Sequence, residues 1–369
     1  MRKIFAAAFL FIFLFNICKA QDPKINEGVS TFVVDSKILK EQKTSYIYFP
    51  SGYQNSDTKY PVVYLLDAEY YFTFTTEAVK ILYDNERIPP CIVVGITTSN
   101  RSRDFTPASD KGWDVPSELS ASGGADNFLS YIETELAPYV EKNYRTQPFR
   151  IIAGHSLGGL FAMYSFVSKP DLFQGYIALE SSLWWSNGSV GNSVIDQLSK
   201  NPERKAKLFM GRLQMPREVW FPVNEKMVDF FEKNHPAGLE YKYMEFDDET
   251  HSTMVFPGVY FGLKSIFSDY FFVLDEKANE TSIMSYYSDL SKKYGYEVTL
   301  PQQIYIFLWF QSMEAKKYND AVKYGELRIK YYPDSFRAYK NLAQTYSDMG
   351  NKEKAAELLE KAKKLNPGG

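Results

Sequence analysis

Ser156 is the residue of this chain whose surroundings most clearly suggest chemistry. It lies in the sequence GHSLG, so that Gly154 and Gly158 stand two positions away on each side. The preceding residues, FRIIAG, are typical of a buried strand, and apolar residues with helical spacing begin directly after the serine. This arrangement matches a nucleophile elbow, where strand and helix backbones nearly touch and a Cβ would clash. Ser156 is therefore the candidate nucleophile, and the backbone N–H of Leu157 is the first candidate oxyanion donor.

A serine nucleophile needs a base, and the chain contains three histidines. His155 adjoins the nucleophile and is expected to point away from its side of the turn. His235 lies in the loop-like stretch EKNHPAG. His251 follows the last predicted strand, in FDDETHSTM, and a histidine at that place in the chain order is typical of α/β hydrolases. We therefore predict His251 as the general base.

The acid that orients the base has more than one candidate. Glu218 lies in the loop after the predicted strand AKLFMG, the usual place for this acid, and we take it as the candidate. Glu180, after the preceding strand, is the rival, and a Ser–His dyad is the third interpretation. The second oxyanion donor is expected in the loop after PVVYLLD, as the backbone N–H of Glu69 or of Ala68.

The elements that must position these residues alternate along the chain. Residues 61–67 and 91–97 are continuous apolar runs, typical of strands covered on both faces. Helical patterns separate them from further predicted strands at 149–154, 175–180, 206–211 and 239–246. Strands that alternate with helices predict an α/β fold with a mostly parallel sheet flanked by helices.

The N-terminal 20 residues have the pattern of a secretory signal peptide. Arg2 and Lys3 precede an apolar stretch, 4–17, that is too short to span a bilayer. We expect cleavage after Ala20, which leaves an exported protein, periplasmic or secreted, with no membrane span and with its hydrolase domain at 21–275. A lipoprotein acylated at Cys18 is the alternative.

Charge and cysteine content narrow the classes of partner. Cleavage would remove Arg2, Lys3 and Lys19, which moves the formal net charge from −3 to −6. This acidic balance argues against a nucleic-acid partner, which needs a basic face. Cys91 would remain as the single cysteine, packed in a buried strand as a small apolar residue. No metal and no other cofactor are expected.

The last 69 residues differ from the rest of the chain. An offset of 34 residues aligns Tyr305 with Tyr339 and Ala321 with Ala355, and the second copy resembles a tetratricopeptide repeat. We predict a small all-α region at 301–369 after a helical linker at 276–300. Two repeats are fewer than the roughly three needed for independent stability, so the tail either docks on the hydrolase or binds a protein partner. We favour docking, because the stretch IYIFLWF is too apolar to face water.

Five motifs, in order, resemble the esterase D-like esterases: YPVVYLLDAEYYF, RSRDFTP, GGADNFLSYIETELAPYV, GHSLGGL and SSLWW. That family includes trilactone siderophore esterases, feruloyl and acetyl-xylan esterases, and mycolyltransferases. The resemblance covers roughly residues 30–272. It implies an α/β-hydrolase fold and hydrolysis of carboxylic esters through an acyl-enzyme, with Ser156 as nucleophile, His251 as base and Glu69 as oxyanion donor.

The chain departs from the family pattern in three places. Ala68 stands where the family has glycine, and Glu180 where many relatives have serine or aspartate. The loop that holds Glu218 lacks the short glycine–acid pattern that is common in relatives.

Two further side chains are expected to line the approach to the nucleophile. Arg103 and Trp184, together with Trp185, suit a carboxylate, a catechol or a sugar face. The alternative is that Arg103 pairs with Asp104 and that one tryptophan belongs to the core.

The predicted function is an exported serine hydrolase that cleaves carboxylic esters, either a siderophore trilactone or an acyl-sugar ester. A catalytically weak hydrolase fold that acts through its repeat tail is the alternative, and an acyltransferase is another. The sequence does not select the ester.

Overall fold

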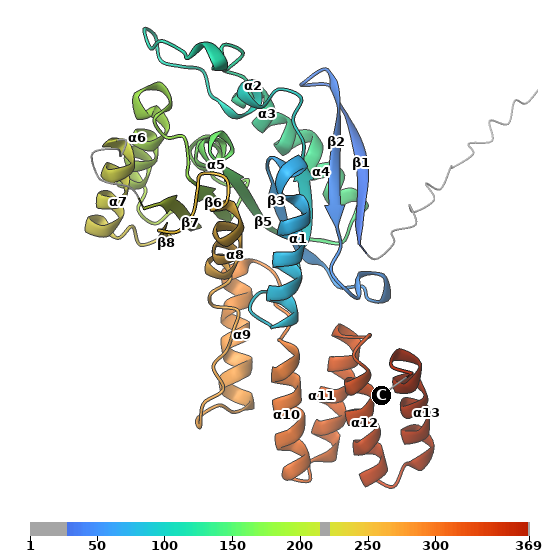
Figure 1. Cartoon of the computed structure of the whole chain (residues 1–369). Helices are drawn as coiled ribbons and strands as arrows, with labels where there is room; N and C mark the ends of the chain where they lie inside the picture. The colour runs from blue at the N-terminus through green and yellow to red at the C-terminus, as the bar shows by residue number, and fades with distance from the viewer. Residues whose placement is uncertain (1–27, 215–221, 368–369) are drawn as a thin grey trace, which may run out of the picture.

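The computed structural model of the protein describes residues 28–214 and 222–367 (Figure 1). The predicted signal peptide, residues 1–20, and the candidate acid Glu218 lie outside the described residues.

An eight-stranded sheet forms the centre of the molecule, with the order β1-β2-β4-β3-β5-β6-β7-β8. The antiparallel pairs β1–β2 and β2–β4 lie at one side, and the other neighbours are all parallel, so the predicted mostly parallel sheet is confirmed. The strands are β1 Val29–Ser36, β2 Glu41–Tyr48, β3 Tyr60–Leu65, β4 Ile92–Ile96, β5 Thr146–His155, β6 Gly175–Leu179, β7 Ala206–Leu213 and β8 Leu239–Phe246.

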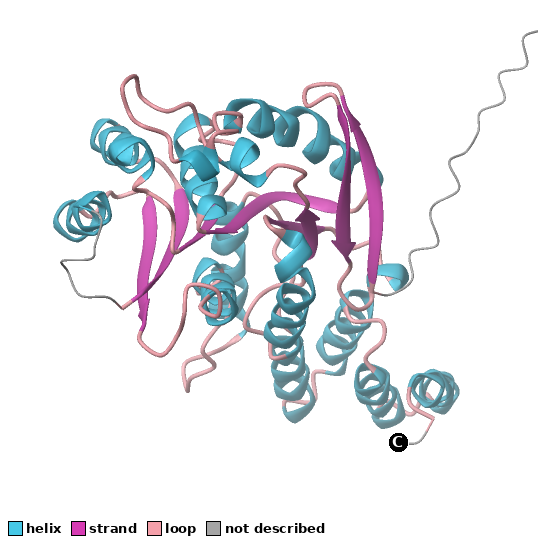
Figure 2. Cartoon of the chain, turned by 45° about the horizontal axis from the view of Figure 1, so that its top comes forward, coloured by secondary structure: helices cyan, strands magenta, loops and turns pink. Residues whose placement is uncertain are grey.

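Helices cover both faces of this sheet, as Figure 2 shows. They are α1 Ala68–Asp84, α2 Arg101–Phe105, α3 Ala125–Tyr131, α4 Ala137–Asn143, α5 Leu157–Ser168, α6 Trp185–Lys200, α7 Pro222–Asn234 and α8 Val255–Ile266. Short turns of other helix types are η1 Tyr53–Asn55, η2 Ser117–Leu119 and the π-helical turn η3 Ile132–Leu136, which joins α3 to α4.

The central strands are buried on both faces, which explains their continuous apolar sequence. Along β3, Val62 and Tyr64 pack into one core, beneath α3–α6, whereas Val63 and Leu65 pack into the other, with α1 and α8. Successive side chains of a strand point to opposite faces, so a strand between two helical layers needs apolar residues at every position.

The C-terminal helices continue the second of these cores. They are α9 Glu280–Tyr294, α10 Gln302–Glu314, α11 Tyr318–Tyr331, α12 Phe336–Asp348 and α13 Lys352–Leu365. Ile283, Tyr287 and Ile304 belong to the same cluster as α1 and α8, so the linker helix α9 and the first tail helix, α10, both pack on the hydrolase. Within the stretch 304–310, however, Phe310 remains 55% exposed, so not all of this apolar stretch is covered. The predicted boundaries at 275 and 300 stay predictions.

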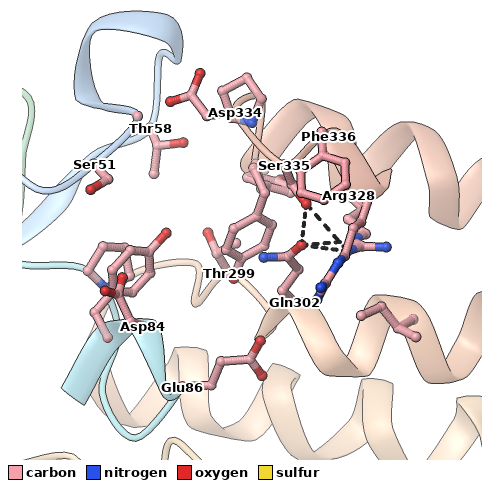
Figure 3. Close-up of a pocket in the computed structure, with 18 of the residues that line it drawn as sticks. Ser51, Thr58, Asp84, Glu86, Thr299, Gln302, Arg328, Asp334, Ser335 and Phe336 are labelled. Atoms are coloured by element: carbon pink, nitrogen blue, oxygen red, sulfur yellow. Dashed lines mark hydrogen bonds between the residues drawn. The ribbon is translucent and has the colours of Figure 1, made fainter. Parts of the chain in front are cut away.

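A cavity of about 460 Å³ lies where the tail meets the hydrolase. Figure 3 shows Gln302, Arg328 and Ser335 of the tail on one side, joined by hydrogen bonds, and Ser51 and Asp84 on the other. The tail thus lies at the edge of the sheet where β3 and β4 begin. No helix among the described residues is both long enough and apolar enough to cross a membrane.

Candidate active site

The nucleophile elbow forms at the point where β5 ends and α5 begins. Ser156 is the N-cap residue of α5 and has φ 58° and ψ −115°, a strained backbone conformation for a residue with a side chain. A Cβ on Gly154 would lie 2.3 Å from the carbonyl oxygen of Gly158, and one on Gly159 would lie 2.9 Å from that of Leu179. The strand and helix backbones are therefore too close for side chains here, which is the reason for the glycines in GHSLGG.

Two helix N-termini meet beside the elbow. Leu157 is the first residue of α5, and Ala68 and Glu69 begin α1, which follows β3, the neighbour of β5 in the sheet. The N–H groups of a first helical turn have no acceptor within their own helix and carry partial positive charge. The structure therefore brings the predicted oxyanion donors to the same edge of the sheet as Ser156. The Glu69 side chain turns aside and accepts a hydrogen bond from the Thr98 N–H at 2.8 Å.

Ser182 is a neighbour of the nucleophile that the sequence analysis did not identify. Its Oγ lies 3.4 Å from the Ser156 Oγ, and its backbone N–H donates to the Ser156 carbonyl at 3.0 Å. Ser182 is 5% exposed and lies in the loop that follows β6. The SSLWW motif signals this place in the sequence, but only the fold shows which of its residues contacts Ser156.

His251 lies in the turn between β8 and α8 and is exposed. Its ring packs beside that of His155, with the ring centroids 4.4 Å apart. Among the described residues no hydrogen bond joins His251 to Ser156, and catalytic hydrogen bonds in unliganded enzymes are commonly formed only with substrate bound. His235 lies after α7, at the amino end of β8, so it is on the opposite edge of the sheet from the elbow.

His155 is a buried neutral histidine. It is 4% exposed, and its Nδ1 lies 3.4 Å from the Tyr71 hydroxyl. Burial, followed by the neighbouring His251, lowers the pKa of His155 to about 3, so the ring carries no charge at neutral pH. The His155 side chain therefore packs against the His251 ring as an uncharged group.

Among the described residues, no hydrogen bond joins His251 to a candidate acid. Glu218 lies outside them. One oxygen of the Glu180 carboxylate accepts a hydrogen bond from the Leu213 N–H at 2.6 Å, and the Glu180 N–H donates to the Gly211 carbonyl at 2.7 Å. Glu180 therefore ties the end of β6 to the end of β7.

Arg103 and Trp184 have neighbours of different kinds. Arg103 donates to Asp104 at 2.7 Å and to Glu41 at 2.8 Å, which is the ion pairing that the alternative interpretation expected. Trp184 is half-buried beside Trp113, whereas Trp185 is fully buried in the core. Trp184 is thus the more accessible of the two adjacent tryptophans.

A polar contact that the sequence analysis did not foresee joins the two loops of the site. Arg101 donates from Nε and Nη2 to both carboxylate oxygens of Asp67, at 2.6 and 3.0 Å, and from Nη2 to the His155 carbonyl at 2.9 Å. These partners are 34 and 54 positions away in the sequence, so no local pattern indicates them.

Known proteins resemble this chain along most of its length. The chain is 31% identical to the ferri-bacillibactin esterase of Bacillus subtilis over 53% of this chain and 75% of that protein. It is 29% identical to a siderophore enterobactin esterase of Emericella nidulans, over 53% and 71% of the two chains. An IroE-like serine hydrolase from Shewanella oneidensis superposes with a TM-score of 0.71 at 31% identity, covering 82% of this chain and 99% of that one.

Two family descriptions match, in separate parts of the chain. The tetratricopeptide repeat family matches residues 336–368, which include α12 and α13. The family described as "Putative esterase" matches residues 36–220, half of the chain, which include the elbow and the strands on either side of it. The chain therefore belongs to this esterase family and is a serine carboxylic ester hydrolase with a tetratricopeptide-repeat tail.

Proposed function

We propose that the protein is an exported esterase that works through an acyl-enzyme on Ser156. The single observation that carries this proposal is the strained serine at the N-terminus of α5, beside the N-terminus of α1. A hydroxyl held there lies near two helix N-termini, whose backbone N–H groups can stabilise the negative charge that develops on an acyl oxygen.

The proposed reaction has two halves. His251 takes the proton of Ser156 while the Ser156 oxygen attacks the acyl carbon, and the oxyanion accepts hydrogen bonds from the N–H groups of Leu157 and of Glu69 or Ala68. Protonated His251 then gives the proton to the departing alcohol, leaving the acyl group on Ser156. Water, deprotonated by the same histidine, releases the acid and restores the enzyme.

The third member of the proposed triad is an acid that orients His251. Glu218 is our candidate because it follows β7, where the chain order of such hydrolases places the acid. Glu180 is engaged with the Leu213 N–H, which favours Glu218 over it. A dyad without an acid is the remaining alternative.

For the substrate we propose a trilactone siderophore ester. The two siderophore esterases that resemble this chain each match 53% of it, and this likeness is what supports the proposal. Trp184 is proposed as a substrate contact because it is partly accessible. Arg103 is proposed with it, through the 35% of its side chain that its ion pairs leave exposed. Acyl-sugar esters and acyl transfer to an acceptor other than water are the alternatives.

Covalent labelling tests the nucleophile without knowledge of the substrate. A fluorophosphonate should label Ser156 in the wild-type protein, and Ser156→Ala should lose both labelling and ester hydrolysis. Ser182→Ala is the matched control, because it removes a neighbouring hydroxyl and should keep the label. Labelling of a serine other than Ser156 would contradict the proposal.

The base and the substrate need separate measurements. His251→Ala should lower kcat by roughly 10³-fold or more, and His235→Ala should leave it unchanged. Hydrolysis of trilactone siderophores, feruloyl and acetyl sugars, and p-nitrophenyl esters should then be compared. A preference for the sugar esters would overturn the siderophore proposal while leaving the esterase intact.

A further inference from the structure

We propose that Arg101 is a positioning residue that fixes the turn carrying one oxyanion donor against the nucleophile elbow. This inference rests on the proposed function of Ser156. It assigns to Arg101 the alignment of the two sets of backbone N–H groups, and not a contact with the substrate.

Arg101 acts where the sheet no longer holds the two loops together. β3 and β5 pair in parallel as far as Leu65 and Ala153, and the Leu66 N–H still donates to the Ala153 carbonyl at 2.9 Å. Beyond that hydrogen bond the chains separate into α1 and α5. Arg101 bridges them just past the end of the ladder, because it contacts Asp67 on one chain and the His155 carbonyl on the other.

Each of these contacts adjoins a group that the reaction uses. Asp67 directly precedes α1 in a left-handed conformation, φ 53°, and its carbonyl accepts hydrogen bonds from the N–H groups of Tyr70 and Tyr71 at 3.0 and 3.3 Å. The backbone conformation of Asp67 therefore determines the direction in which the N–H groups of Ala68 and Glu69 point. The His155 carbonyl belongs to the peptide bond that enters Ser156, so holding that carbonyl also orients the elbow.

The carboxylate of Asp67 also touches the helix behind the nucleophile. A Cβ on Gly158 would lie 3.2 Å from the Asp67 Oδ2, so this oxygen lies close to the first turn of α5. Asp67 is 3% exposed. Burial raises its pKa, and the hydrogen bonds and charge of Arg101 counteract this effect. The pKa of Asp67 stays above its ordinary value, and Arg101 offsets part of the cost of burying this carboxyl between the two helix N-termini.

Only an arginine can make all three contacts. Its planar guanidinium presents Nε and Nη2 to the two carboxylate oxygens, and the second hydrogen of Nη2 remains for the carbonyl. Lysine carries a single ammonium, which retains the charge but has no fork to hold both loops in one orientation. Arg101→Lys therefore separates the charge of the pair from its geometry.

A small ester is the right substrate for the test. p-Nitrophenyl acetate has no carboxylate or catechol for a guanidinium to recognise, so its turnover reports alignment of the reacting groups. We expect Arg101→Lys to lower kcat by about 10- to 100-fold, the scale of a misplacement of about 1 Å, with KM changed by less than about twofold. The rate of fluorophosphonate labelling at Ser156 should fall in parallel.

Lys207→Gln is the matched control. Lys207 is a paired cation like Arg101, with its side chain 7% exposed and its partner Asp269 at 2.9 Å, but it lies at the start of β7, away from the elbow. We expect it to lower the melting temperature without changing kcat for the folded enzyme. Arg101→Gln should lower both the melting temperature and kcat. In Arg101→Lys the melting temperature should return closer to the wild-type value than kcat does.

Three results would overturn this inference. KM could rise in Arg101→Lys with kcat unchanged, which would make Arg101 a substrate contact. The kcat of Arg101→Lys could equal that of the wild type. Alternatively, kcat and the melting temperature of Arg101→Lys could both recover, relative to Arg101→Gln, to the same extent. Failure of the proposed function gives a different result, since Ser156→Ala would then keep its hydrolysis whatever the Arg101 variants do.

Discussion

Ile304→Ala tests whether the repeat tail is part of the hydrolase core. Ile304 lies in the first turn of α10 and is fully buried in the cluster that contains α1 and α8. The substitution removes three carbons, at roughly 0.8 kcal/mol each, and leaves a cavity, so the free energy of unfolding should fall by about 3 kcal/mol. At about 2 °C per kcal/mol for a chain of this size, the melting temperature should fall by roughly 6 °C.

Ile306→Ala is the matched control, because it makes the same change two positions along the same helix. Ile306 is 37% exposed, so its substitution should cost about 1 kcal/mol or less. The assay follows far-UV circular dichroism and residual ester hydrolysis on the same temperature ramp. In Ile304→Ala the two signals should disappear together. If part of the helical signal were lost at a lower temperature while hydrolysis persisted above that temperature, the shared core would be refuted. Equal shifts of the melting temperature in Ile304→Ala and Ile306→Ala would refute it as well.

Two other substitutions test the site. Gly154→Ala should abolish fluorophosphonate labelling of Ser156, because the added Cβ would lie 2.3 Å from the Gly158 carbonyl oxygen; labelling at the wild-type rate would show that the elbow tolerates a side chain. Burial lowers the pKa of His155 to about 3, against about 6.5 in an unfolded chain, so the unfolded state binds the extra proton and stability falls as the pH drops from about 6.5 toward 3. Urea unfolding at pH 7 and pH 4 should therefore show a smaller loss of stability in His155→Gln than in the wild type, and an equal loss would contradict this account.

The parts of the site that were predicted from sequence are those that local geometry dictates. Gly154 and Ser156 lie within one turn, where the close approach of two backbone segments requires glycine, and this requirement is visible in the sequence. The alternation of strands and helices likewise predicted the sheet, because a doubly covered strand must be apolar throughout.

The contacts between distant segments were not predicted, because nothing local encodes them. Arg101 meets Asp67 and the His155 carbonyl only after three loops have converged at one edge of the sheet. Ser182 reaches Ser156 for the same reason. The π-helical turn η3 between α3 and α4 is another feature that no local motif announced, and it keeps residues four apart, from Phe128 to Val140, on the buried face.

The core shared by the tail and the hydrolase has a consequence for how the chain folds during synthesis. The cluster that contains α1 and α8 is completed by Tyr287, Tyr294 and Ile304, which are translated long after the elbow. Domains generally fold as units as they emerge from the ribosome. Here the core on one face of the sheet stays incomplete until α9 and α10 have emerged, so the esterase acquires its finished interior well after its own strands and helices have been translated.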